Sequence, residues 1–223
     1  MSYELRLYQD RLAAKCTARR RLVNPVTALY VVDGALRLAS DGACGVLGAN
    51  SAWHPDAQWT PGAGSLPTTV LRWELVAAGS PDNALSGEGV NSRLALASTL
   101  PLDSARKYLL RCDRVDFPPG GVALTHTHAG AGIRCVLSGD MRIRCLGAEH
   151  AYGFLEPWFE AGADPVFAVA SATVPTAFSR VMILPRELLG RSSIRYVHAE
   201  DQNKPKNQSY QIFLDEPVEL PAG

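Results

Sequence analysis

The chain has 223 residues, of which 47% are hydrophobic and 20% are charged, and its formal net charge is zero. This length suits one large all-β domain or two domains of about 100 residues each. The balanced charge gives no electrostatic reason to expect binding to nucleic acid or to an anionic membrane.

The N-terminal stretch "MSYELRLYQDRLAAK" is charged and lacks the apolar core of a secretion signal, and no run approaches the roughly 18 apolar residues of a membrane span. The five cysteines are irregularly spaced and form no C-x-x-C pair. Such spacing does not suggest a disulfide framework. We therefore expect a soluble protein in the reducing cytoplasm, with no membrane or nucleic-acid partner.

Short β-type segments, separated by glycine and proline, are expected along most of the chain. In chain order they cover 27–32, 68–76, 133–137, 141–146, 165–172, 179–185, 193–197 and 210–214. Helical signals are weak and predict one or two turns at most, in 10–15, 102–110 and 185–190. This pattern is typical of an all-β sandwich or barrel with few short helices.

Two segments, 27–64 and 132–165, resemble each other. Each has a strand, a turn at Gly34 or Gly139, a second strand, a loop and a tryptophan-containing stretch, and the two glycines are 139 − 34 = 105 residues apart. This spacing suggests duplication of a whole domain. The polar stretch 76–92 between them is rich in turn residues, which predicts a boundary near residue 90, with domains 1–90 and 91–223. The last strand, "YQIFL", forms a C-terminal arm that pairs with a barrel or with a partner subunit.

Two histidines, His126 and His128, stand one residue apart in the predicted extended stretch "THTHAGAGIRCVLSG". In a strand, residues i and i+2 point to the same side, so the two imidazoles are expected to share a face. Two such imidazoles can share one Zn, Fe, Ni or Cu ion. The alternative is a pair of surface or hydrogen-bonded histidines.

The stretch "GGVALTHTHAGAGIRCVLSG" resembles the first conserved motif of the cupin superfamily: Gly, five residues, His-x-His, three or four residues, Glu, six residues, Gly. Gly120, His126, His128 and Gly139 fit this spacing, whereas the glutamate position falls on Gly132.

The second cupin motif, Pro-x-Gly-x-x-His, looks closest to "EAGADP". Gly162 matches, but Glu160 stands at the proline position and Pro165 at the histidine position. The resemblance therefore keeps two of the four usual ligands. It implies two tandem cupin-type barrels, each a double-stranded β-helix or jelly roll.

In the first repeat, the positions that correspond to the histidines and the glutamate fall on Arg21, Val23 and Thr27. We expect that barrel to be structural and free of metal. In the second barrel, Glu160 is predicted to reach the ion and complete a set of two histidines and one carboxylate. The alternative is a loop acid or an ion-pair partner.

Arg134 has the same parity as Gly132 along its strand, so both would face the barrel interior. A buried guanidinium needs a partner, which is either Glu160 or the carboxylate of a substrate. Gly130 and Gly132 leave room beside the histidines, for a ligand or for a bent strand. Trp158 is expected at the barrel mouth as a substrate contact, or else in the core.

The resemblance implies a bicupin that binds a divalent metal (Fe, Ni, Zn or Mn) and acts on a small molecule bearing a carboxylate or an aromatic ring. Dioxygenase chemistry would use Fe(II), whereas isomerase, lyase or decarboxylase chemistry would use the metal as a Lewis acid. The alternatives are a non-catalytic binding or sensory protein that has lost metal ligands, and a metal-free enzyme with a histidine as general base. By analogy with other cupins, we expect a homodimer.

Overall fold

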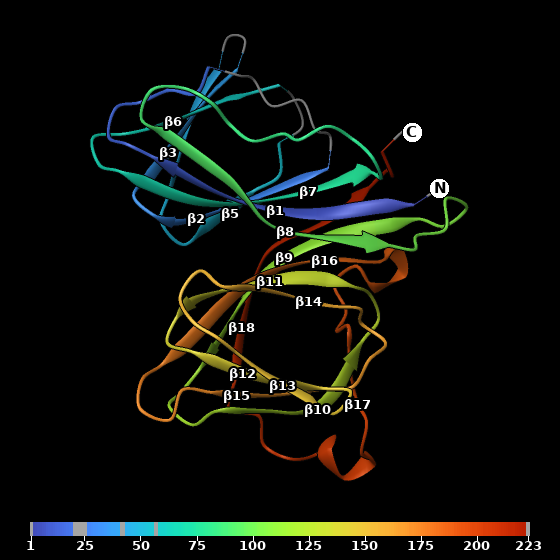
Figure 1. Cartoon of the computed structure of the whole chain (residues 1–223). Coiled ribbons are helices and arrows are strands. Elements are labelled where there is room, and N and C mark those ends of the chain that lie inside the picture. The colour runs from blue at the N-terminus through green and yellow to red at the C-terminus, as the bar shows by residue number, and fades with distance from the viewer. Residues whose placement is uncertain (1, 20–25, 41–42, 56–57, 222–223) are drawn as a thin grey trace. The chain divides into compact units, whose positions relative to one another are not determined.

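The computed structural model describes residues 2–19, 26–40, 43–55 and 58–221. The chain divides into two compact units, and the described residues of both are built almost entirely of antiparallel strands (Figure 1). The first unit contains Met1–Arg106 and Val218–Gly223, and the second contains Lys107–Pro217. In the described part of the chain, no helix has the length and hydrophobicity needed to cross a membrane.

The first unit holds two sheets around one apolar core. One sheet has the strand order β5-β2-β7-β1-β8 and the other has the order β4-β3-β6. The core contains buried side chains from both sheets, among them Leu12, Val31, Leu36 and Val70. The strands are β1 (Tyr3–Leu12), β2 (Thr27–Asp33), β3 (Ala35–Ser40), β4 (Ala43–Gly48), β5 (Ser51–Trp53), β6 (Thr60–Ala63), β7 (Thr68–Ala77) and β8 (Val90–Leu100).

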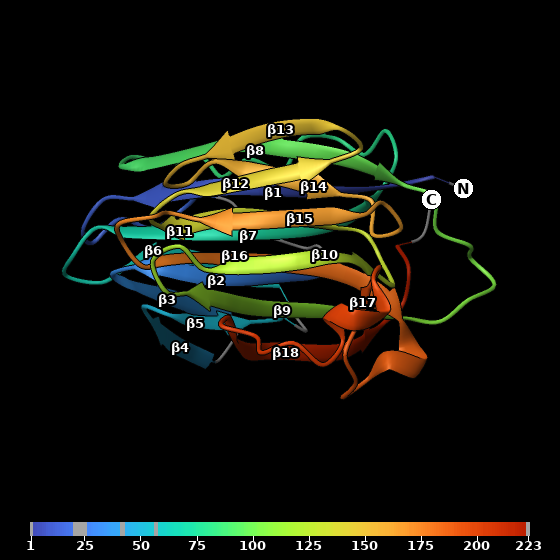
Figure 2. The same cartoon turned by 90° about the horizontal axis from the view of Figure 1, so that it is seen from below.

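The second unit holds two five-stranded sheets, with the orders β14-β11-β16-β9-β18 and β13-β12-β15-β10-β17. Figure 2 looks onto the latter sheet. The strands are β9 (Tyr108–Phe117), β10 (Val122–His128), β11 (Gly132–Ser138), β12 (Met141–Cys145), β13 (Ala148–Tyr152), β14 (Pro157–Glu160), β15 (Val166–Ala170), β16 (Thr176–Pro185), β17 (Ile194–Tyr196) and β18 (Ser209–Val218).

The two sheets of the second unit pack their apolar faces together as a jelly-roll barrel. Val136 and Phe178 from one sheet share a buried cluster with Ile143 and Ala168 from the other. Along β15 the burial alternates residue by residue, as a strand with one face in a core requires. The all-β prediction is therefore confirmed, and two short 3-10 helices, Arg186–Leu188 and Ala199–Asp201, add little to it.

The eight predicted β-type segments all contain strands, but the long strands β1, β8 and β9 lie outside them, as do the shorter strands β3, β4, β5, β6, β10, β13 and β14. The helical predictions for 10–15 and 102–110 are wrong, because these residues belong to the end of β1, to turns and to the start of β9. β1 pairs with both β7 and β8, and this tertiary pairing overrides a weak local helix preference. The prediction for 185–190 is confirmed by the first 3-10 helix.

The internal repeat appears in the strand registers of the two units. Leu29 of β2 lies opposite Trp53 of β5, and Arg134 of β11 lies opposite Trp158 of β14. The first members of these pairs are 134 − 29 = 105 residues apart, as are the second members, 158 − 53 = 105. This matches the spacing of the two turn glycines, so the strand pairs are equivalent.

The turn glycines themselves explain why the repeat is visible in the sequence. Gly34 and Gly139 have φ values of +75° and +67°, a region that favours glycine. A Cβ atom would come within 2.3 Å of the Pro67 carbonyl oxygen at Gly34, and within 2.4 Å of the Thr176 hydroxyl at Gly139. Each turn therefore requires glycine for both its conformation and its packing.

The predicted boundary near residue 90 differs from the division into compact units. β8 begins at Val90 and pairs along its length with β1, so the residues that follow belong to the first unit until Arg106. The C-terminal arm β18 joins the second unit as an edge strand beside β9. Of the first-repeat positions, Thr27 is buried at the start of β2, whereas Arg21 and Val23 lie outside the described residues.

Candidate functional site

A small cavity inside the second unit contains the predicted site residues. Its polar wall consists of His126, His128, Arg134, Glu160 and Arg180, and the indole of Trp158 lies among the apolar side chains that complete the lining. We refer to it as the histidine cavity. Its volume is about 20 Å³, which is room for about one water molecule.

The two histidines lie at the end of β10 and share one face, as predicted. Each is only 6% exposed, and their ring centroids are 4.8 Å apart. The Nδ1 atom of His126 lies 2.7 Å from the carbonyl oxygen of Leu124. Because a carbonyl only accepts, Nδ1 carries the proton of the neutral ring, and Nε2 keeps its lone pair. Burial lowers the pKa of His126, which favours this neutral form.

His128 has a partner at each ring nitrogen. Its Nε2 lies 3.4 Å from Nη1 of Arg180, and its Nδ1 lies 3.4 Å from the hydroxyl oxygen of Ser193. A guanidinium can only donate, so Nε2 of His128 accepts and Nδ1 carries the proton. Burial lowers the pKa of His128 well below its usual range, and the charges of Arg180 and Arg134 lower it further.

Arg134 lies on β11 and is 1% exposed, so its predicted inward orientation is confirmed. Its Nη1 donates to the carbonyl oxygen of Gly132 at 2.6 Å, and its Nη2 is 2.7 Å from Oε2 of Glu160. Burial lowers the pKa of Arg134 to about 10 in spite of the nearby carboxylate. The predicted pairing of Arg134 with Glu160 is therefore present.

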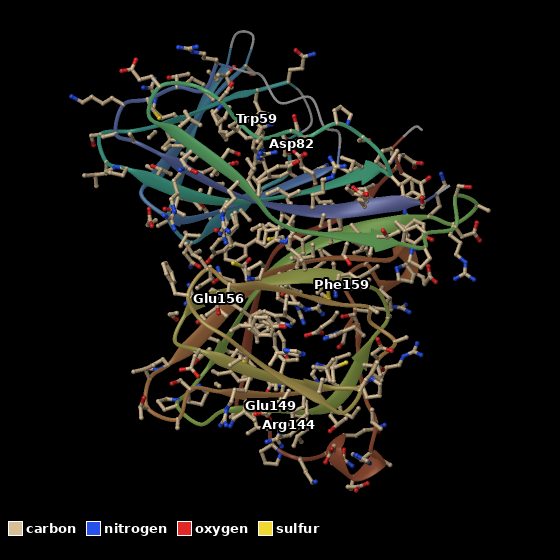
Figure 3. All side chains as sticks on the ribbon, in the orientation of Figure 1. Trp59, Asp82, Arg144, Glu149, Glu156 and Phe159 are labelled. Atoms are coloured by element: carbon tan, nitrogen blue, oxygen red, sulfur yellow. The ribbon has the colours of Figure 1, made fainter. Side chains whose placement is uncertain are left out.

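Glu160 lies on β14, directly opposite Gly132 of β11. Its Oε1 accepts a hydrogen bond of 2.8 Å from Nε1 of Trp158, and its Oε2 is 3.8 Å from Nε2 of His128. Trp158 and Glu160 share the inner face of β14, while Phe159 between them belongs to the opposite face (Figure 3). Glu160 thus reaches the histidines from the neighbouring strand, but its closest charged partner is Arg134.

The space that Gly130 and Gly132 leave is filled by protein. A Cβ atom at Gly132 would lie 2.3 Å from the carbonyl oxygen of Val181, and one at Gly130 would lie 2.1 Å from that of Ile183. The expectation of room for a ligand beside these glycines is therefore wrong. Both glycines instead allow the backbone of β16 to approach closely, which neither the ligand nor the bent-strand alternative anticipated.

Sequence reasoning missed Arg180, which completes the polar wall. It lies on β16 opposite Asp113 of β9, and its Nε and Nη2 donate to that carboxylate at 2.6 and 3.1 Å. Burial lowers the pKa of Arg180, but the Asp113 carboxylate outweighs it, and the net shift is upward. A signal was present, because an arginine inside the apolar run "SRVMILP" must find a partner when the strand is buried.

No protein-family model matches the chain, and no curated protein sequence matches it significantly. Solved structures do match. AerE from Microcystis aeruginosa superposes with a TM-score of 0.57 and 14% identity, over 79% of this chain and 87% of that one. A variant of oxalate decarboxylase from Bacillus subtilis gives 0.60 and 11%, over 90% and 73%. The putative glyoxylate-induced protein from Pseudomonas aeruginosa gives 0.57 and 15%, over 81% and 74%.

The fold of the chain is of the cupin type. The sequence resemblance to the cupin superfamily is therefore confirmed at the level of the fold. At identities of this size, the likeness extends to the fold alone and says nothing of the chemistry in the histidine cavity.

The polar residues of the histidine cavity do not fit a divalent ion as they are arranged. Nε2 of His128 faces a guanidinium of Arg180, and the Glu160 carboxylate is paired with Arg134. A dication bound there would lie beside two buried positive charges, which is unfavourable in a low-dielectric interior. Among the described residues, no group of three or more His, Cys, Asp or Glu side chains is arranged to hold a metal. The predicted metal role of His126, His128 and Glu160 stays a prediction.

Proposed function

We propose that the second unit binds the carboxylate group of a small molecule at the histidine cavity, and that it does so without a resident metal ion. The observation that carries this proposal is a pair of buried polar atoms. Nη2 of Arg134 and Oε2 of Glu160 form an ion pair at 2.7 Å, but neither atom makes a hydrogen bond, so each can still bond to a further partner. Buried groups in this condition normally have a water or ligand partner.

The charges around the cavity support an acidic ligand. Arg180 uses Nε and Nη2 for Asp113, so Nη1 is directed at His128 and can also donate to a ligand. A carboxylate between Arg134 and Arg180 would accept charge-assisted hydrogen bonds from two guanidinium groups, which are the donors that fit it best. Each such bond contributes about 1.5–3 kcal/mol.

Two of the structural neighbours suggest suitable probes, because their names contain oxalate and glyoxylate. Oxalate is the better first probe, since it carries two carboxylates and no apolar group, and so tests the charges of the cavity wall alone. The test is isothermal titration of the purified chain with oxalate, before and after dialysis against EDTA, with the metal content measured in parallel. We expect the same Kd in both preparations.

The critical variant is Arg134→Met combined with Glu160→Gln, which removes the guanidinium without leaving a buried carboxylate unpaired. We expect it to weaken oxalate binding at least about tenfold. The matched control is Arg144→Met with Glu149→Gln, since this ion pair is exposed and lies away from the cavity, on β12 and β13 (Figure 3). Oxalate binding that disappears with EDTA, together with stoichiometric metal that His126→Ala abolishes, would support the metal-dependent alternative and refute this proposal.

A second candidate function is proton transfer to or from the bound acid. It is favoured by His126, whose Nδ1 is held by the Leu124 carbonyl and whose Nε2 keeps an unprotonated lone pair in the wall of the cavity. A neutral imidazole fixed in this way can act as a general base. Exchange of the methyl protons of pyruvate in D₂O, followed by proton NMR, would detect the activity. Exchange at the same rate with His126→Gln would exclude it and leave a binding protein. The homodimer and the cytoplasmic location stay predictions.

A further inference from the structure

The second unit contains another, larger pocket. It lies between β18 and the segment 190–196, and its volume is about 290 Å³. Its apolar wall is formed by Ile194, Tyr196, Tyr210 and Ile212, and we call it the outer pocket. A pocket of this size approaches the range in which proteins bind small organic molecules.

The outer pocket and the histidine cavity have two residues in common. Arg180 and Tyr210 line both of them. The Arg180 guanidinium carbon lies 5.8 Å from the centre of the Tyr210 ring, and Tyr210 is 48% exposed. Arg180 and Tyr210 therefore form a wall between the two spaces, and Nε2 of Gln208 donates to the Tyr210 hydroxyl at 3.1 Å.

Two buried arginines of the outer pocket, Arg111 and Arg180, are paired with carboxylates of the protein. The buried guanidinium of Arg111 is held by both carboxylate oxygens of Asp215 at 2.9 Å. Asp113 is held by Arg180 in the same way. What remains for a ligand is an apolar wall of two tyrosine rings and two isoleucines, a polar edge formed by Arg191, Ser192 and Ser193, and Nη1 of Arg180 at the inner end.

We propose that the outer pocket holds the apolar body of the acid whose carboxylate reaches Arg180 and the histidine cavity. The ligand class is then an aryl or branched aliphatic carboxylic acid, rather than a two-carbon acid. This inference rests on the proposed function and goes further, because a cavity of about 20 Å³ has no room for such a body while the outer pocket does.

The test compares acetate, isovalerate and phenylacetate as ligands of the unmodified chain by isothermal titration. All three carry one carboxylate and differ only in the apolar group. Burial of a phenyl ring in the outer pocket should make phenylacetate bind on the order of 10- to 100-fold more tightly than acetate, with isovalerate between them. Equal Kd values for the three acids would overturn the inference.

The critical variant is Ile212→Trp, which fills the outer pocket. Ile212 is 53% exposed, so the larger side chain is compatible with folding. We expect phenylacetate to bind Ile212→Trp as weakly as acetate does, while the Kd of acetate itself is unchanged. Gln211→Trp is the matched control, because Gln211 is exposed on the same strand and does not line the pocket. It should leave both Kd values unchanged.

The outcomes separate this inference from the proposed function. If Ile212→Trp leaves phenylacetate binding unchanged, the outer pocket is not used, and the proposed function stands as long as Arg134→Met/Glu160→Gln still weakens acetate. If oxalate binds the unmodified chain but none of the three acids does, the inference fails and the proposed function stands. If oxalate does not bind either, both fail.

Discussion

The ion pair between Arg134 and Glu160 predicts how the second unit responds to loss of one charge. The side chains are 1% and 8% exposed, and Nη2 lies 2.7 Å from Oε2. Arg134→Met removes the guanidinium and leaves the Glu160 carboxylate buried beside Trp158. Removal of one partner of a buried pair typically costs 3–5 kcal/mol, because the remaining charge is uncompensated. The hydrogen bond from Arg134 to the Gly132 carbonyl is lost as well.

The double variant Arg134→Met/Glu160→Gln should recover most of that loss. Its neutral amide can still accept the hydrogen bond from Trp158, and replacement of a whole buried pair by uncharged groups is often neutral or stabilising. We therefore expect Arg134→Met to lower the free energy of unfolding by about 3–5 kcal/mol, and the double variant by less than about 1 kcal/mol.

The assay is urea unfolding followed by far-ultraviolet circular dichroism. Hydrogen exchange and mass spectrometry of peptides from β11 and β14 would confirm that the second unit is the part affected. Since the chain has two units, exchange assigns the change where a single unfolding curve does not. The reasoning is refuted if the single variant costs less than about 1 kcal/mol, or if the double variant is as unstable as the single one.

Two further predictions concern packing and pH. Gly132→Ala should destabilise the second unit by at least about 2 kcal/mol, because the new Cβ would lie 2.3 Å from the Val181 carbonyl oxygen. The control is Gly45→Ala, whose Cβ would have nothing within 4 Å, and it should be nearly neutral in the same urea assay. The free energy of unfolding should also fall as the pH drops below about 6.5, which is the pKa of histidine in the unfolded chain. Burial lowers the pKa of His126 and His128 in the folded state. Between these pKa values only the unfolded chain takes up protons at the two histidines, so acid favours unfolding. The free energy of unfolding should fall by roughly 1 kcal/mol per histidine between pH 7.5 and 5.5. A free energy of unfolding that does not change with pH in the unmodified protein would contradict this prediction, as would an unchanged pH dependence in His126→Gln/His128→Gln.

The local rules of β-structure made much of this chain predictable. Gly34 and Gly139 mark turns that only glycine fits, so their spacing revealed the repeat directly. His126 and His128 had to share a face, since side chains alternate along any strand. The same parity placed Arg134 inside the barrel. Each of these inferences needed only residues close together in the sequence.

The partners of these residues depended on strand register, which no local pattern contains. Arg180 contacts His128 from 52 residues away, and Glu160 reaches Arg134 only because β14 pairs with β11. The close approach of β16 filled the space at Gly132 that the sequence suggested was open. The sequence by itself determined which side chains face the barrel interior. The tertiary structure alone decided that two guanidinium groups face the histidines, because long-range pairing sets which buried charges meet.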